Sequence, residues 1–263
     1  LDIELDFIND GLWMKTDDVN LGGVRASNLT AVIPDYSKEK LLIDADIKGP
    51  GKAVGPYFDE TPLKDSLGAT LQELQLDGDV NARLHLDIPL NGELVTAKGE
   101  VTLRNNSLFI KPLDSTLKNL SGKFSFINGD LQSEPLTASW FNQPLNVDFS
   151  TKEGAKAYQV AVNLNGNWQP AKTGVLPEAV NEALSGSVAW DGKVGIDLPY
   201  HAGATYNVEL NGDLKNVSSH LPSPLAKPAG EPLAVNVKVD GNLNSFELTG
   251  QAGADNHFNS RWL

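Results

Sequence analysis

The sequence contains no cysteine, which excludes disulfide bonds and thiolate metal sites. It has no signal sequence, and no apolar run approaches the roughly 20 residues that a bilayer-spanning helix needs, so any membrane anchor is expected outside this stretch. Basic residues are few: 21 lysines and arginines stand against 34 aspartates and glutamates, and the formal net charge is -13. Because such a chain repels phosphate groups, nucleic acid is not an expected partner.

The motifs of common catalytic and cofactor sites are also missing. There is no Gly-x-Ser-x-Gly, no phosphate-binding Gly-Lys-Ser, no His-Glu-x-x-His and no dinucleotide fingerprint, and the four histidines have no ligand spacing. Residues 77–81 imitate the start of a calcium loop, but Ala82 and Ile88 stand where such a loop needs Gly and Glu. We therefore predict that the protein is not an enzyme and holds no metal and no cofactor.

What the sequence does contain is a regular alternation of apolar and polar residues. In residues 117–149 the apolar positions recur every second residue, as in Phe124 and Phe126 or Val147 and Phe149, and their neighbours are mostly polar. Asn128-Gly129 supplies the backbone freedom for a tight hairpin. This pattern predicts an antiparallel meander with one apolar and one wet face.

The same period runs through most of the chain, and two short stretches interrupt it. Thr61 as N-cap, Pro62 at the first helical position and Gly68 as terminator predict one short helix, and residues 176–184 predict another. The predicted strands outside the meander are residues 3–7, 12–19, 29–33, 42–47, 76–90, 95–103, 108–110, 158–164, 188–190, 194–198, 206–210, 235–239 and 246–248.

A short pattern recurs within these strands: an apolar residue, a polar one, glycine, a polar one, then an apolar one. Its glycines are expected to turn, bulge or coil strands that would otherwise run straight. A single copy would be an ordinary hairpin, and the repetition favours a quasi-repetitive curved sheet. The copies are centred on Gly78, Gly122, Gly166, Gly186, Gly212 and Gly241.

The apolar side of such strands has to be covered, and the residues leave several answers open. Two short helices are too few to cover it, which leaves a sandwich or barrel with a sealed core, or a sheet rolled into an open groove. The sealed alternative would be a structural or adhesive β-sandwich array. A carbohydrate or glycolipid binder is the remaining alternative, with stacking platforms among Trp13, Trp140, Trp168, Trp190 and Trp262.

Three features of the sequence resemble the AsmA-like family of proteins. They are the repeated Leu-x-Gly-x-apolar strands, the Gly-Pro, Pro-Tyr-Phe and Thr-Pro-Leu residues within 49–63, and Leu-Ser-Gly-Lys-Phe-Ser-Phe-Ile-Asn-Gly-Asp-Leu followed by Leu-Thr-Ala-Ser-Trp in the meander. The whole chain is similar to an internal segment of a large enterobacterial member. The resemblance implies a repeating β-groove: a mainly β fold whose long, strongly twisted antiparallel sheet is curled into an open apolar groove, with two short helices.

The resemblance also implies a function, a bridge-like lipid transporter. Such a protein is anchored in the inner membrane of a Gram-negative bacterium and crosses the periplasm, and phospholipid moves between the inner and outer membranes along the groove. Phospholipid acyl chains are the implied partner, and both membranes are reached through parts outside this stretch. In these terms residues 1–49 end one groove unit, 50–75 form a helical connector, 76–175 a groove unit, 176–186 a short helix and 187–263 further groove strands.

The alternation also predicts which residues point inward. By alternation alone these side chains would form a dry core between packed sheets, whereas the resemblance implies that they line a lipid groove. The predicted lining residues are Leu84, Leu86, Ile88, Val101, Leu103, Phe124, Phe126, Trp140, Val147, Phe149, Val160, Val162, Leu164, Val208, Leu210, Val235, Val237, Val239, Phe246 and Leu248.

Overall fold

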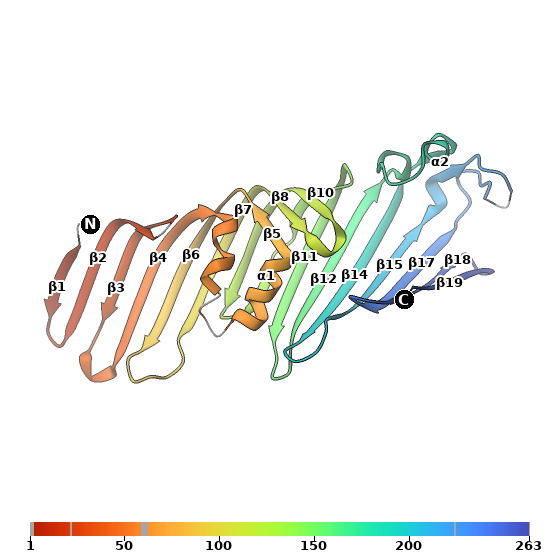
Figure 1. Cartoon of the computed structure of the whole chain (residues 1–263). Coiled ribbons are helices and arrows are strands. Elements are labelled where there is room, and N and C mark those ends of the chain that lie inside the picture. The colour runs from red at the N-terminus through yellow and green to blue at the C-terminus, as the bar shows by residue number, and fades with distance from the viewer. Residues whose placement is uncertain (1–2, 22, 59–62, 224, 263) are drawn as a thin grey trace. The chain divides into compact units, whose positions relative to one another are not determined.

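The computed structural model describes residues 3–21, 23–58, 63–223 and 225–262. The chain divides into two compact units, Leu1–Glu134 (unit 1) and Pro135–Leu263 (unit 2). Each unit consists mostly of antiparallel strands that lie side by side (Figure 1). The predicted fold class, mainly β and antiparallel with two short α-helices, is therefore confirmed.

In unit 1 most strands pair with the next strand along the chain. The exception is the short strand β5: β4 pairs with β6, and β5 pairs with the far half of β7. The strands are β1 (Glu4–Ile8), β2 (Gly11–Leu21), β3 (Val24–Ile33), β4 (Lys40–Pro50), β5 (Leu74–Asp77), β6 (Asp79–Pro89), β7 (Thr96–Ile110), β8 (Ser115–Ile127) and β9 (Asp130–Ser133).

Unit 2 has the same meander. The short strands β13 and β16 form a separate pair, and the other strands of the unit pair in chain order from β10 to β19. The strands are β10 (Leu136–Trp140), β11 (Gln143–Glu153), β12 (Ala157–Trp168), β13 (Leu184–Gly186), β14 (Val188–Pro199), β15 (Thr205–Asp213), β16 (Val217–Ser219), β17 (Ala234–Asn242), β18 (Phe246–Ala252) and β19 (Asn256–Trp262).

The two α-helices lie in or directly after the two stretches predicted to be helical, but the predicted end of the first helix is wrong. Gly68 does not terminate it: Gly68 keeps right-handed helical angles, φ -58° and ψ -50°, and the π-helix η4 continues directly into α1. Thr61 and Pro62, predicted to begin this helix, lie outside the described residues. The helical elements are η1 (Tyr36–Lys38), η2 (Gly51–Ala53), η3 (Gly55–Phe58), η4 (Lys64–Gly68), α1 (Ala69–Glu73), η5 (Lys111–Leu113), η6 (Pro170–Lys172), α2 (Glu178–Ala183) and η7 (Leu214–Asn216).

The predicted strand 76–90 is also wrong as a single element. Gly78 has φ +91° and separates β5 from β6. The fully buried side chain of Asn106, from β7, fills this break: its Nδ2 donates to the carbonyl oxygens of Asp77 at 3.0 Å and Asp79 at 3.1 Å. The glycine therefore breaks the strand, which agrees with the role predicted for the repeated glycines.

The fully buried apolar set is small for a chain of this length. Many of its members are alanines, such as Ala26, Ala31 and Ala45, and the largest fully buried side chain is Tyr158, whose hydroxyl donates to Thr151 Oγ1 at 2.8 Å. Several large apolar side chains are exposed within the described residues, for example Phe7 at 73%, Leu94 at 88% and Leu243 at 74%.

Candidate functional site

In unit 1 the strand register brings the predicted lining residues onto one face. Cross-strand partners in an antiparallel sheet share a face, and Val101 pairs with Phe124. Leu84 and Leu86 pair with Gly99 and Ala97, on the same face of β7 as Val101. We call this the apolar face of unit 1; its predicted members are Leu84, Leu86, Ile88, Val101, Leu103, Phe124 and Phe126.

In unit 2 the strand register also brings the predicted lining residues onto one face, over a longer row of strands. Val162 lies between Phe149 and Val194, and the row continues through Val208, Val239 and Leu248. We call this the apolar face of unit 2; its predicted members are Trp140, Val147, Phe149, Val160, Val162, Leu164, Val208, Leu210, Val235, Val237, Val239, Phe246 and Leu248.

Some residues of these faces were missed by the sequence analysis. Ile43 and Ala45 pair with Leu86 and Leu84, and Val194 and Ile196 pair with Val162 and Val160. All four lie in strands that the alternation predicts, so the same period-two pattern was sufficient to find them.

The side chains of both apolar faces are half-buried. Among the predicted lining residues, only Leu103 and Val147 are buried, with 4% and 7% of their surface exposed, and the others are intermediate. A dry core between two sheets would bury them nearly completely.

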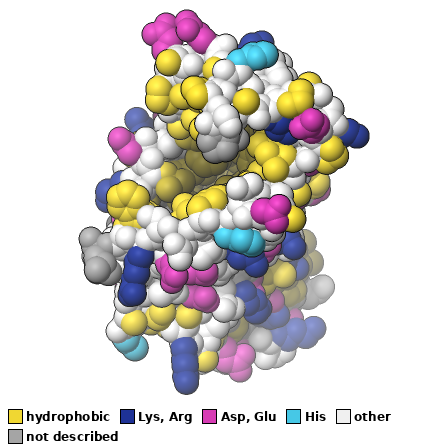
Figure 2. Space-filling view, turned by 90° about the vertical axis from the view of Figure 1, so that its right-hand side faces the viewer, with side chains coloured by type: hydrophobic (Ala, Val, Ile, Leu, Met, Phe, Trp, Pro, Cys, Tyr) yellow, Lys and Arg dark blue, Asp and Glu magenta, His cyan; other side chains and the backbone are white. Residues whose placement is uncertain are grey.

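Figure 2 shows hydrophobic side chains inside a hollow on the side of unit 2 that carries its C-terminal strands, with charged side chains around it. Among the described residues of unit 2, the strands outside its main row form one further sheet, the two-stranded β13–β16 pair.

The opposite faces are polar and held by cross-strand pairs. In unit 1 Lys123 Nζ donates to Glu100 Oε1 at 2.8 Å, and this bond raises the pKa of Lys123. In unit 2 Asn163 Nδ2 donates to Asp148 Oδ1 at 2.7 Å. In each unit the strands therefore have one wet face and one apolar face, as the alternation predicts.

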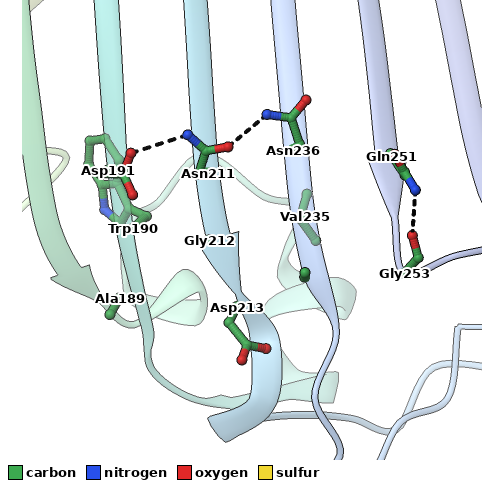
Figure 3. Close-up of a pocket in the computed structure, with 11 residues that line it drawn as sticks. Ala189, Trp190, Asp191, Asn211, Gly212, Asp213, Val235, Asn236, Gln251 and Gly253 are labelled. Atoms are coloured by element: carbon green, nitrogen blue, oxygen red, sulfur yellow. Dashed lines mark hydrogen bonds between the residues drawn. The ribbon is translucent and has the colours of Figure 1, made fainter.

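A row of amide and carboxylate side chains crosses the polar face of unit 2. Asn236 Nδ2 donates to Asn211 Oδ1 at 2.7 Å, and Asn211 Nδ2 donates to Asp191 Oδ2 at 3.2 Å (Figure 3). A pocket of about 540 Å³ lies beside this row, where the small residues Ala189 and Ala234 leave space. Since these side chains bond mainly to one another, the row is ordinary cross-strand pairing on a solvated face.

The structure brings three of the tryptophans together and leaves the other two apart. Trp168 lies at the centre of this cluster, with its ring centroid 6.3 Å from that of Trp140 and 4.8 Å from that of Trp190. Phe141 stacks on Trp140 at 4.7 Å. Trp13 is in β2 of unit 1 and Trp262 ends β19, so the five tryptophans form no common stacking platform.

The described residues offer little for catalysis or metal binding. They contain no group of three or more His, Asp or Glu side chains that could hold a metal ion, and none of their helices is long and apolar enough to cross a membrane. The carboxyl groups with displaced pKa values are exposed and paired locally: a hydrogen bond from Arg25 lowers the pKa of Asp18, and hydrogen bonds from Ser37 lower that of Asp35. None of these lies on an apolar face.

The fold and the two half-buried faces define a class of protein, an antiparallel β-sheet protein with open apolar surfaces. The chain belongs to the YhdP protein family, whose model matches residues 1–263. It is 99% identical over 263 residues to the intermembrane phospholipid transporter YhdP of Escherichia coli (strain K12). The match covers 100% of this chain and 21% of that relative, so the chain spans about a fifth of the relative's length. No solved structure matches the chain. That relative is the large AsmA-like member that the sequence resembles, so the family predicted from the sequence is confirmed.

Proposed function

We propose that the apolar faces of this chain carry the acyl chains of phospholipids, as one periplasmic section of a bridge-like transporter between the inner and outer membranes. The observation that carries the proposal is the unbroken row of half-buried apolar side chains across neighbouring strands in each unit. The name of the near-identical relative, an intermembrane phospholipid transporter, supports phospholipid as the cargo. The role is one of binding and conduction, with no catalytic step.

The free energy of hydrocarbon in water explains why such a surface is needed. Exposing a methylene group to water costs roughly 0.8 kcal/mol, so a two-chain lipid with about 30 methylenes would meet a penalty on the order of 20 kcal/mol. An apolar surface that continues from strand to strand removes most of this cost. The polar faces remain in water, and the headgroup stays in contact with it.

The proposal extends to the setting of the chain. The transporter would be anchored in the inner membrane of a Gram-negative cell and would support the lipid balance and barrier of the outer membrane. Residues 50–75, with η4 and α1, and residues 176–186, with α2, would be connectors between groove units. Contacts with either membrane would be made by parts outside this chain.

The test uses photo-crosslinking in cells at two neighbouring positions of β12. Val162 lies on the apolar face between Phe149 and Val194, and Asn163 lies on the polar face, bonded to Asp148. A benzophenone amino acid at Val162 is expected to give phospholipid adducts by mass spectrometry, and the same group at Asn163 is expected to give none. If Val162 crosslinks only to protein, the face is a sealed core and the proposal is wrong.

A further inference from the structure

The aromatic cluster of unit 2 lies at one end of its strands. We define the tryptophan rim as Trp140, Phe141, Trp168 and Trp190. Trp140 is the last residue of β10, Trp168 is the last of β12, and Trp190 is the third of β14, which runs antiparallel to β12. By register Trp140 and Trp190 belong to the apolar face, since Trp190 pairs with Gly166 and Gly212.

The side chains next to this rim differ in polarity. Towards the middle of the strands come aliphatic rows: Leu164 and Val162 in β12, then Val194 in β14. At the level of the rim itself Gln143 pairs with Trp140, and its Oε1 accepts a hydrogen bond at 3.2 Å from the backbone N–H of Gln169, the residue that follows Trp168. The aliphatic rows thus end in a cluster of aromatic rings beside an amide hydrogen bond, and indole rings are most stable where apolar and polar surroundings meet at a lipid interface.

One member of the rim has an unused hydrogen-bond donor. Trp168 Nε1 donates to the carbonyl oxygen of Pro144 at 2.7 Å. Trp190 Nε1 is buried and has no hydrogen-bond partner among the described residues. A buried donor without a partner is unfavourable by about 1–3 kcal/mol, so an acceptor oxygen brought to Trp190 by a ligand would be stabilising.

The other end of the same strands differs. Tyr158, at the start of β12, is fully buried and its hydroxyl is already bonded to Thr151. Further along that end Phe246 stacks on Trp262 at 5.9 Å, and Trp262 is 58% exposed. In the described part of the chain, neither Tyr158 nor the Phe246–Trp262 pair presents a buried donor without a partner.

We propose that the tryptophan rim seats the glycerol ester region of a glycerophospholipid, with Trp190 Nε1 donating to an ester carbonyl oxygen after a small rotation of its ring. The acyl chains then lie over the aliphatic rows, and the headgroup lies beyond the rim, on the side of Gln169. This inference rests on the proposed function and adds an orientation: lipid enters unit 2 with its polar end at the ends of β10 and β12. The rim thus positions the cargo.

The experiment measures quenching of tryptophan fluorescence by brominated phosphatidylcholine, with bromine either near the ester end or near the methyl end of the acyl chain. The reporter is the Trp13→Phe, Trp262→Phe variant, which keeps the tryptophan rim intact and changes only residues outside it. Its fluorescence is expected to lose more intensity with the ester-end bromine than with the methyl-end bromine. The Trp190→Phe change in this background is expected to reduce the quenching difference and weaken lipid binding.

A matched control follows Trp262 at the other end of the strands. Its signal is obtained as the difference between the Trp13→Phe variant and the reporter variant, so no rim residue has to be changed. The expected result is that Trp262 shows no preference for the ester-end bromine.

The outcomes distinguish a failure of the proposed lipid orientation from a failure of the proposed function. Stronger quenching of the rim by the methyl-end bromine, or a preference for the ester-end bromine at Trp262, would reverse the orientation and overturn this inference while leaving lipid conduction intact. Absence of quenching by either lipid would mean that unit 2 holds no acyl chain, and the proposed function would fail with it.

Discussion

Where a strand is interrupted, a single side chain can supply the hydrogen bonds that the backbone groups at the break would otherwise lack. Asn106 is the clearest case, because its amide bonds to the carbonyls of Asp77 and Asp79 and its Oδ1 accepts from the backbone N–H of Arg104 at 2.8 Å. Asn106→Ala is expected to destabilise the chain by about 1–3 kcal/mol, since it leaves buried backbone groups without partners. Urea unfolding measures the loss. The control is Asn81→Ala on the half-buried polar side of β6, expected within about 0.5 kcal/mol of the native chain.

The exposed ion pair of β2 and β3 gives a pH prediction at the same scale. Arg25 Nε and Nη2 both donate to the carboxylate of Asp18 at 2.7 Å, and this bonding lowers the pKa of Asp18. Because the folded pKa is depressed, the small stabilisation from this pair is present above the unfolded pKa of the carboxyl and is lost as pH falls through the folded value. Arg25→Gln is expected to raise the pKa of Asp18 towards its ordinary value, which NMR titration of the carboxyl would detect. An unchanged pKa would show that Arg25 is not its cause.

At the scale of the element, glycines of the apolar face allow strands to approach closely. Gly99 in β7 pairs with Phe126 in β8, and a Cβ on Gly99 would overlap the carbonyl oxygen of Arg83 and lie 2.8 Å from the ring of Phe126. Gly99→Ala is therefore expected to destabilise unit 1 by about 1–3 kcal/mol, as overpacking does. Gly203→Ala is the matched control, because a Cβ there meets no atom within 4 Å. Equal midpoints of thermal unfolding for the two variants would contradict this account.

At the scale of the whole molecule, an apolar face that is open to lipid and one that is sealed in a core predict different effects of a charge introduced on that face. Val162 is half-buried on the apolar face of unit 2. If the face is open to lipid, Val162→Asp should leave the fold intact and impair phospholipid transport, because the carboxylate places a charge where acyl chains would lie. Circular dichroism and lipid transfer between the membranes of growing cells measure the two effects.

The matched variant for this comparison is Asn163→Asp, which adds the same charge to the polar face one residue away. It is expected to preserve both fold and transport. Unfolding of the Val162→Asp chain, with Asn163→Asp unaffected, would instead indicate that the apolar face is a sealed core.

The period-two alternation by itself determined most of the antiparallel strands and which of their side chains share a face, although β13, β16 and β19 were not among the predicted strands. It did so because a strand places successive side chains on opposite faces and pairing preserves this division from strand to strand. The 99% identical relative likewise confirmed the resemblance that the sequence carried.

Only the tertiary structure decided how far those faces are covered, because alternation is the same for a sealed core and for an open surface. It also decided that the strand breaks at Gly78, where Asn106 from a distant strand supplies the bonds, and that the first helix continues through Gly68. The meeting of Trp140, Trp168 and Trp190 depends on strand register over residues far apart in sequence, and no local pattern encodes such a contact.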